Sequence, residues 1–419
     1  MTREDRTQHQ RRNKPLYILL AGHDDGLGAF SIMSRFAHAL LKQAGAQGLS
    51  LRLIFYCQKS RTQFRYFGLD LPQIGLLPNE VTIKLPKDPG ANAVAAPEIL
   101  KLLHELAVII PKAGELNWEK IQWFGPDPDF HGWPDLTLAV SMGVPFIHPA
   151  ARGAGVKSLE IGDMCFSLVL RGCLAEAGLR TPYVEGVLDT IATAEQMASE
   201  VWLLPIAAPV EYETYFGSAG IPVHRMPGIF GTQDHQEKEH TEDLARQLKI
   251  KTGNRPIVGI HAGATHVWDG AIRTIARRPP GLSPAIIELK NDQIYLLEND
   301  CSVPIIELPV LPSKVPLFKN QLFGITRGGI TVLDHIAARC PVAIAEEPCH
   351  WLSLRQRQQA IQSGLCIPVS LEEFRHNPEE VIQGLLRQEK ELGAVREKMN
   401  KIKVGVEEEL AEKVLSFEF

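Results

Sequence analysis

Residues 324–360, "GITRGGITVLDHIAARCPVAIAEEPCHWLSLRQRQQA", decide the fold. They read as an apolar strand, a glycine turn, a helix and a second apolar strand, followed by an acidic, proline-broken loop and a polar helix. Open α/β sheets bind their ligands at the carboxyl ends of strands, where such glycine turns lie. The stretch therefore predicts a strand–turn–helix–strand unit with its ligand edge at the paired glycines.

The chemistry of this turn is that of an anion site. Gly328 and Gly329 let the backbone approach a ligand closely, and the helix that follows directs its free N–H groups at the same point. Arg327 adds a guanidinium suited to phosphate, and Thr331 adds a hydroxyl donor. Asp334, one turn further, suits a ribose diol. Together they predict a nucleoside diphosphate; an ordinary strand end with a capped helix is the alternative.

Length and composition agree with a large soluble α/β protein. The 419 residues exceed what one core supports, which favours two domains. A net charge of -5 gives no general nucleic-acid footprint, so we expect no nucleic-acid partner. The seven scattered cysteines form no CxxC pair, which indicates no metal site. No run is long and apolar enough to span a membrane, so we expect a cytoplasmic protein, with contact at a membrane surface left open.

The first half repeats the strand–turn–helix pattern. "LYILLAG" (16–22) ends in glycine, "FSIMSRFAHALLKQAG" (30–45) has helical spacing, and "LSLRLIFYC" (49–57) is a second strand. This βαβ order predicts a Rossmann-like domain. Further expected elements are strands at 121–125, 146–149 and 200–205, and helices at 94–109 and 159–177.

A second α/β set begins at "RPIVGIHAG" (255–263) and adds strands near 284–290, 293–299, 303–309, 322–328 and 341–348. We therefore predict two Rossmann-like, doubly wound parallel-sheet domains facing each other across a cleft. The predicted divisions are a disordered tail (1–14), an N-terminal Rossmann-like domain (15–228), a linker (229–254), a C-terminal Rossmann-like domain (255–376) and C-terminal helices (377–419).

Other strand ends supply further candidates. In "HAGATH" (261–266), Gly263 and Thr265 are possible donors to a second phosphate, with a plain tight turn as the alternative. The first turn, "AGHDDGLGAFS" (21–31), carries three possible general bases, or else a solvated turn; they are His23, Asp24 and Asp25. A third group precedes an expected helix and lines the cleft or merely forms turns and caps; it comprises Asp127, Asp129, His131 and Asp135.

Residues 315–360 resemble the donor-binding half of GT-B glycosyltransferases, in particular the UDP-sugar-dependent group that includes the lipid II-forming N-acetylglucosaminyltransferase. The resemblance implies that the Arg327–Gly329 turn and Thr331 hold the diphosphate and that Asp334 stands where the family has a ribose-binding Glu. Gln356, Gln359 and Ala360 match the last motif of the family. The resemblance also implies transfer without a metal or a cofactor, and C-terminal helices that cross back to the N-terminal domain.

Two positions depart from the family pattern. Ala29 stands where the family has its general-base His, and Arg355 stands where several members have an acidic residue. Either the base comes from His23, Asp24, Asp25, Asp127 or His131, or the protein no longer performs ordinary sugar transfer. The expected activity is transfer of a sugar from a nucleoside diphosphate, with UDP favoured, to an unidentified small or lipid-linked acceptor. The alternatives are a nucleotide-sugar epimerase or hydrolase on the same fold, and a non-catalytic nucleotide-binding protein.

Overall fold

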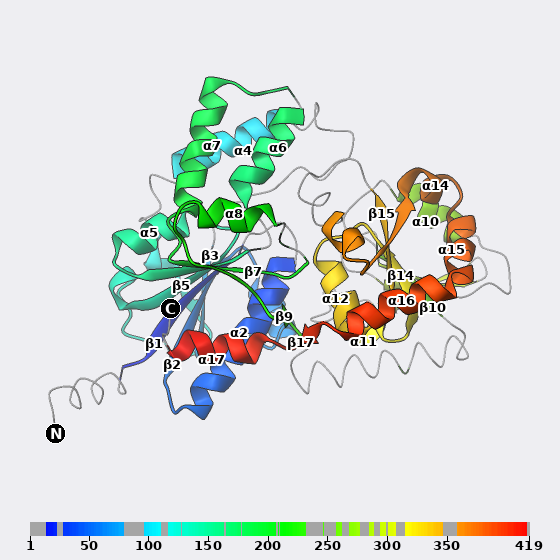
Figure 1. Ribbon diagram of the computed structural model, residues 1–419. Helices are drawn as coiled ribbons and strands as arrows, with labels where there is room; N and C mark the ends of the chain where they lie inside the picture. The colour runs from blue at the N-terminus through cyan, green and yellow to red at the C-terminus, as the bar shows by residue number, and fades with distance from the viewer. Residues whose placement is uncertain are drawn as a thin grey trace.

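The structure is a computed structural model of the whole chain. It describes residues 14–22, 28–78, 96–109, 116–126, 128–162, 165–176, 178–206, 208, 210–231, 246, 257–261, 268–276, 285–288, 294–298, 301–306, 315–346 and 358–416. These residues form two α/β domains that lie side by side (Figure 1).

The N-terminal domain is built on an eight-stranded sheet in the order β4-β3-β2-β1-β5-β6-β7-β8. All neighbouring strands run parallel except the edge pair β3 and β4. The strands are β1 Leu16–Gly22, β2 Leu51–Cys57, β3 Ile74–Pro78, β4 Gln122–Trp123, β5 Leu136–Met142, β6 Lys157–Gly162, β7 Glu200–Leu203 and β8 Val223–Arg225.

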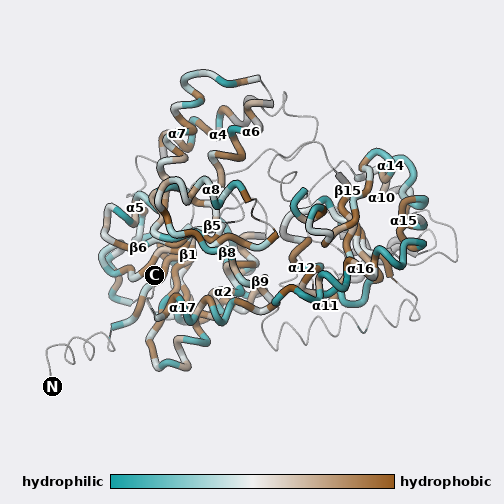
Figure 2. Tube along the Cα trace, viewed as in Figure 1, coloured by the Kyte–Doolittle hydropathy of each residue, from teal (hydrophilic) through white to brown (hydrophobic). Residues whose placement is uncertain are grey.

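Helices cover both faces of this sheet, which explains the uninterrupted apolar runs. In β1, Ile18 and Leu20 face the core that includes α2, whereas Leu19 and Ala21 face the core on the opposite side. The strands of this sheet are accordingly coloured mainly as hydrophobic in Figure 2. The helices are α2 Gly28–Ala46, α3 Arg61–Tyr66, α4 Ala96–Ile109, α5 Ile147–Gly153, α6 Phe166–Glu176, α7 Pro182–Glu195 and α8 Glu211–Gly217.

The centre of the chain's first half differs from the sequence-based expectation. The helix expected after Asp135 is β5, which pairs with β1 in the middle of the sheet. The strand expected at 146–149 lies at the start of α5, and the helix expected over 159–177 is divided between β6 and α6. Short apolar runs have the same composition in buried strands and buried helices, so only the pairing partner decides between them.

The C-terminal domain contains a seven-stranded sheet in the order β13-β12-β11-β10-β14-β15-β16. Its β10, β11, β14, β15 and β16 pair in parallel, as expected, but β12 runs antiparallel to both β11 and β13. The strands are β10 Ile257–His261, β11 Ala285–Glu288, β12 Ile294–Glu298, β13 Cys301–Ile306, β14 Gln321–Thr326, β15 Val342–Glu346 and β16 Ile367–Ser370.

The helices of this domain are α10 Asp269–Ala276, α11 Val315–Phe318, α12 Ile330–Ala338, α14 Leu371–His376, α15 Pro378–Arg387 and α16 Glu389–Asn400. On one face of the sheet, Trp268 beside α10 packs against Phe374 of α14 with ring centroids 4.9 Å apart. On the other face, α11 and α12 join the same core cluster as α2 of the N-terminal domain. The two domains therefore share apolar packing around α2 and α12.

The chain's last segment connects the domains a second time. After α16, the short strand β17 (Lys403–Val404) pairs with β9 (Gly228–Ile229), and α17 (Glu407–Ser416) packs against α2 (Figure 1). Glu407 accepts a hydrogen bond from the N–H of Gly231 at 3.0 Å, and Lys42 of α2 pairs with Glu408. Arg339 of α12 donates to the carbonyl oxygen of Ile402 at 2.9 Å.

Within these residues, no helix combines the length and the apolar character that crossing a bilayer would require.

Candidate functional site

The turn between β14 and α12 leads into the N-terminus of α12. We call such a helix N-terminus, together with the turn before it, the entrance of the helix. Gly328 and Gly329 have φ angles of 108° and 73°, a region that favours glycine. Gly329 is the N-cap of α12, and among the residues that the structure describes no side-chain hydrogen bond caps the helix there. The N–H of Gly328 donates to the Thr326 hydroxyl at 3.3 Å. Within the described part of the chain, the first N–H groups of α12 therefore have no side-chain acceptor, an arrangement that suits an anion.

The neighbouring strand brings a second turn to the same edge. β10 and β14 are adjacent and parallel, and their last residues, His261 and Thr326, are register partners. The turn that follows β10 therefore starts beside the entrance of α12. Gly263 and Thr265 belong to that turn and lie outside the described residues.

A buried aromatic and polar cluster seats α12 on the sheet. The His335 ring, from α12, stacks on Phe318 at 4.0 Å between centroids and an interplanar angle of 13°. Position 324 must be glycine, because a Cβ there would lie 2.2 Å from Cε1 of His335. In the same cluster, Nε2 of His261 lies 3.3 Å from the side-chain oxygen of Gln321. This packing fixes the direction in which the entrance of α12 points.

Asp334 connects this entrance to the other domain. Its Oδ1 accepts a hydrogen bond from Nη2 of Arg35, on α2, at 3.0 Å. Both residues are buried, Arg35 at 6% and Asp334 at 8% exposure. Figure 1 shows α2 and α12 meeting where the two domains adjoin. The pair is thus a buried ion pair between domains, one turn behind the entrance of α12.

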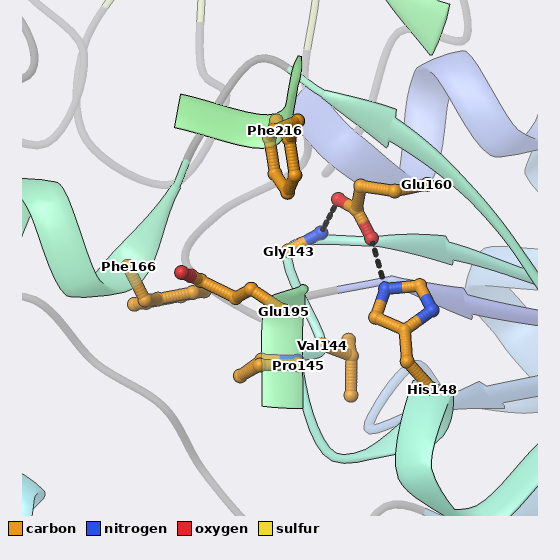
Figure 3. Close-up of a pocket in the computed structure, with 8 residues that line it drawn as sticks. All are labelled: Gly143, Val144, Pro145, His148, Glu160, Phe166, Glu195 and Phe216. Atoms are coloured by element: carbon orange, nitrogen blue, oxygen red, sulfur yellow. Dashed lines mark hydrogen bonds and ion pairs between the residues drawn. The ribbon is translucent and has the colours of Figure 1, made fainter. Parts of the chain in front are cut away.

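The N-terminal domain has a small pocket at the carboxyl ends of β5 and β6 (Figure 3). Glu160 of β6 accepts from the N–H of Gly143 at 2.8 Å, and its second oxygen lies 3.0 Å from Nε2 of His148. Nδ1 of His148 lies 3.0 Å from the Ser158 hydroxyl. The pocket has room for about one water molecule. These contacts hold α5 against β6 and leave no room for a sugar.

Glu195, which also lines this pocket, caps the entrance of α6. It accepts hydrogen bonds from the N–H of Ser167 at 3.2 Å and from the Ser167 hydroxyl at 2.6 Å. The Cys165 thiol, at 3.1 Å, and the Tyr215 hydroxyl, at 2.8 Å, donate to its Oε2. Burial raises the pKa of Glu195, and the four hydrogen bonds oppose that rise. Burial likewise raises the pKa of the Cys165 thiol, which makes it an inert group.

Comparison with known proteins gives a fold and no family. No family model matches the chain, and no curated protein matches it in sequence. Among solved structures, the calicheamicin glycosyltransferase CalG4 is similar, with a TM-score of 0.56 and 14% identity over 96% of this chain and 98% of that one. The kitacinnamycin glycosyltransferase has a TM-score of 0.55 and 12% identity, over 96% and 99% of the two chains.

An epimerase shares the same architecture. UDP-GlcNAc 2-epimerase from Neisseria meningitidis, solved with UDP-GlcNAc bound, has a TM-score of 0.52 and 12% identity, over 96% of this chain and all (100%) of that one. These likenesses extend over both domains. The protein has the GT-B fold. The resemblance inferred from residues 315–360 is thereby confirmed at the level of the fold, while the comparisons do not single out the lipid II-forming group.

Within this GT-B frame, most of the predicted donor-binding residues lie together. Arg327 and Thr331 flank the two glycines at the entrance of α12 and are half-buried. Asp334 follows Thr331 by three positions, so the two lie on one helix face. Gln359 is half-buried and Ala360 is buried, within the helical residues 358–362. Gln356 and Arg355 lie outside the described residues.

His131 lies apart from the other candidates. It precedes the amino end of β5, and its neighbour Phe130 packs on Tyr17 near the amino end of β1, with ring centroids 4.8 Å apart. The carboxyl ends of these strands are about 20 Å away, given about 3.3 Å per strand residue. Nε2 of His131 lies 3.0 Å from Asp129, and its N–H donates to Asp135 at 2.6 Å. The turn-and-cap interpretation fits this group, and His131 gains no support as a base.

His23, Asp24, Asp25 and Asp127 lie outside the described residues, and the first three directly follow the carboxyl end of β1. Ala29, at 1% exposure, belongs to the apolar core at the start of α2. Its methyl group has no proton to exchange, so a base at this domain must be another residue.

Several buried ionisable residues were not among the sequence candidates, and they include Arg35, His148, Glu160 and Glu195. Arg35 left a signal, because it is a single charge within the apolar helix 29–41. The others have no local signature. Their partners lie 10 to 30 residues away in sequence and meet only after the sheet has formed.

Proposed function

We propose that the protein is a glycosyltransferase. It transfers a sugar from a nucleoside-diphosphate sugar, with a UDP-sugar favoured, to a hydroxyl group of an acceptor held by the N-terminal domain. The observation that carries this proposal is the uncapped, glycine-lined entrance of α12 at the carboxyl end of β14, with Arg327 beside it. The GT-B fold agrees with this activity.

The donor's diphosphate occupies the entrance of α12 in this proposal. The N–H of Gly329 and the first N–H groups of α12 donate to phosphate oxygens, beside the Gly328 N–H that is held by Thr326. The positive end of the helix dipole adds to their effect, and Arg327 supplies a full charge. Gly263 and Thr265 serve the same diphosphate from the turn after β10, and Gln356 contacts the donor. The Asp334 carboxylate accepts from the ribose.

Transfer then follows a displacement at the sugar's C1. The acceptor oxygen forms a bond to C1 while the bond between C1 and the phosphate oxygen breaks, and its electron pair leaves with the nucleoside diphosphate. His23, Asp24 or Asp25 takes the acceptor's proton. The entrance of α12 stabilises the added negative charge on the leaving group, so the chain's own groups perform the task for which other transferases use a metal ion.

Equilibrium titration tests the proposal directly. We expect saturable binding of UDP, monitored by calorimetry, and weaker binding of uridine because it lacks the diphosphate. A chain that binds neither UDP nor any other nucleoside diphosphate contradicts the proposal.

A second candidate function is epimerisation or hydrolysis of a nucleotide sugar. It is favoured by the similarity to an epimerase that was solved with UDP-GlcNAc, and by Ala29, which removes the expected transferase base. Incubation with UDP-GlcNAc alone separates the candidates, since only an epimerase or hydrolase consumes it without an acceptor. If nucleotide is bound but never turned over with any acceptor, the protein is a non-catalytic nucleotide-binding protein.

A further inference from the structure

The buried ion pair between Arg35 and Asp334 joins two helix entrances. α12 begins four residues before Asp334 and α2 begins seven residues before Arg35, about 6 and 10 Å along the two helices. Each helix follows the carboxyl end of a central strand, β14 and β1 respectively. The pair therefore lies just behind the edges of both sheets at which α/β proteins bind ligands.

Arg35 occupies only one of the two carboxylate oxygens of Asp334. Arg35 bonds to Oδ1 at 3.0 Å, and within the described part of the chain no hydrogen bond reaches Oδ2. A buried carboxylate holds its charge only when a cation or donor compensates it. Arg35 provides that compensation and orients the group, while Oδ2 keeps acceptor capacity on the helix face that Asp334 shares with Thr331.

Arg35 also reduces the electrostatic repulsion between Asp334 and a bound diphosphate. A carboxylate one turn behind a diphosphate repels it, and the repulsion is strong in a buried site. A guanidinium bonded to that carboxylate cancels most of this repulsion. The bound diphosphate is therefore favoured by the intact pair and disfavoured when Asp334 is left as an uncompensated charge.

We propose that Arg35 is a positioning residue for nucleotide recognition. From the N-terminal domain it holds Asp334 charged and oriented for a ribose hydroxyl in the C-terminal domain. The donor site is thus completed by both domains, and the nucleotide is bound tightly only when α2 and α12 adjoin as they do here. This inference rests on the proposed function, because it takes the ligand to be a nucleoside diphosphate.

The test compares UDP with 2′-deoxy-UDP by calorimetry in the full-length protein and in Arg35→Gln. We expect the wild-type protein to prefer UDP by about tenfold, the loss expected for one charge-assisted hydrogen bond. In Arg35→Gln, UDP affinity falls by about tenfold or more and the preference for UDP shrinks toward one. Arg35→Lys restores part of both. Arg65→Gln is the matched control, an exposed pair with Asp70 in the same domain, and leaves both unchanged.

Asp334→Asn keeps the test decisive if Arg35→Gln does not fold. It gives the same loss of preference, and adding Arg35→Gln to it produces little further loss because the two residues act as one unit. Unchanged or tighter UDP binding in folded Arg35→Gln, with the preference kept, overturns this inference alone. A wild-type protein that binds no nucleoside diphosphate overturns the proposed function, and this inference with it.

Discussion

Two helix entrances in this molecule occupy equivalent positions and differ in how they are filled. α6 and α12 each follow the carboxyl end of a parallel strand, β6 and β14. At α6, the N–H of Cys165 donates to the Tyr212 hydroxyl at 3.0 Å and the N–H of Ser167 donates to Glu195. At α12, the N-cap is Gly329, and no described residue provides a side-chain cap.

This difference is the reason why we propose α12, and not α6, as the ligand-binding site. The free N–H groups at a helix start need acceptors, and α6 receives them from its own chain, including a buried carboxylate. An anion approaching α6 would meet Glu195, whereas an anion approaching α12 meets glycine backbone and Arg327. The entrance of α12 begins with two glycines and has a cation, Arg327, beside it. It is therefore the entrance suited to an external anion.

Removing the built-in cap of α6 has the largest expected effect. Glu195→Ala removes the shared acceptor of four hydrogen bonds at a buried position, which we expect to lower the free energy of unfolding by about 3 to 5 kcal/mol. Urea unfolding measures the change. Glu397→Ala, at an exposed position on α16, is the control and shifts the midpoint little. Equal midpoints for the two variants would show that the cap carries no stability.

Adding a carboxylate to the first turn of α12 tests the comparison at the second helix. Thr331→Asp places a carboxylate in the first turn, where it favours the helix by about 0.3 to 1 kcal/mol. The same charge repels a diphosphate, so UDP affinity falls by about a hundredfold, an effect of order 3 kcal/mol. Calorimetry and thermal melting record the two effects together. Thr331→Asn, without the charge, binds UDP far better; equal affinities in the two variants contradict an anion site at α12.

Removing the cation beside α12 has a smaller effect. Arg327→Ala loses charge-assisted hydrogen bonds to phosphate, which are worth about 1.5 to 3 kcal/mol, so UDP affinity falls by about 10 to 100-fold. Uridine, which has no phosphate, binds Arg327→Ala and wild type alike. A loss that is the same for uridine and UDP would assign Arg327 to the base or ribose rather than to the diphosphate.

The last prediction is a pH dependence of stability at α6. Because burial raises the pKa of Glu195, the folded state holds its proton more tightly than the unfolded state does. This contribution to stability is present below the ordinary Glu pKa and is lost as pH rises through the folded value. The stability of wild type relative to Glu195→Gln therefore falls from pH 4 to pH 7, by at most about 1.4 kcal/mol per pH unit. A constant or rising difference contradicts this assignment.

The sequence predicted the features that depend on local pattern. The glycine turn at 328–329, its cation and the strand on either side of α12 are contiguous in the chain, and their order alone indicates the binding edge. The two-domain α/β fold followed from the same repeated unit. Most parallel strands of the C-terminal sheet were placed near their observed positions, because each is an apolar run that ends in glycine or a charged turn.

The features that the sequence did not predict depend on partners that are distant in sequence. β5 was interpreted as part of a helix because its place beside β1 is decided by pairing rather than by composition. Glu195 and Ser167 are 28 residues apart and meet through α6 and α7, and Arg35 and Asp334 are 299 residues apart and meet only when both domains have folded. His131 was placed with the base candidates because its cluster was expected to line the cleft, but residue types do not say at which end of a strand a loop lies.

The most direct test of the central claim follows the backbone amide of Gly328 during a UDP titration. Carbonyl-¹³C arginine combined with ¹⁵N-glycine selects glycines that follow arginine, and the chain has three of them, Gly153, Gly172 and Gly328. We predict that the Gly328 amide resonance shifts with saturation as UDP binds, while the signals of Gly153, in α5, and Gly172, in α6, stay in place. Saturable UDP binding that leaves the Gly328 resonance unmoved would contradict the account.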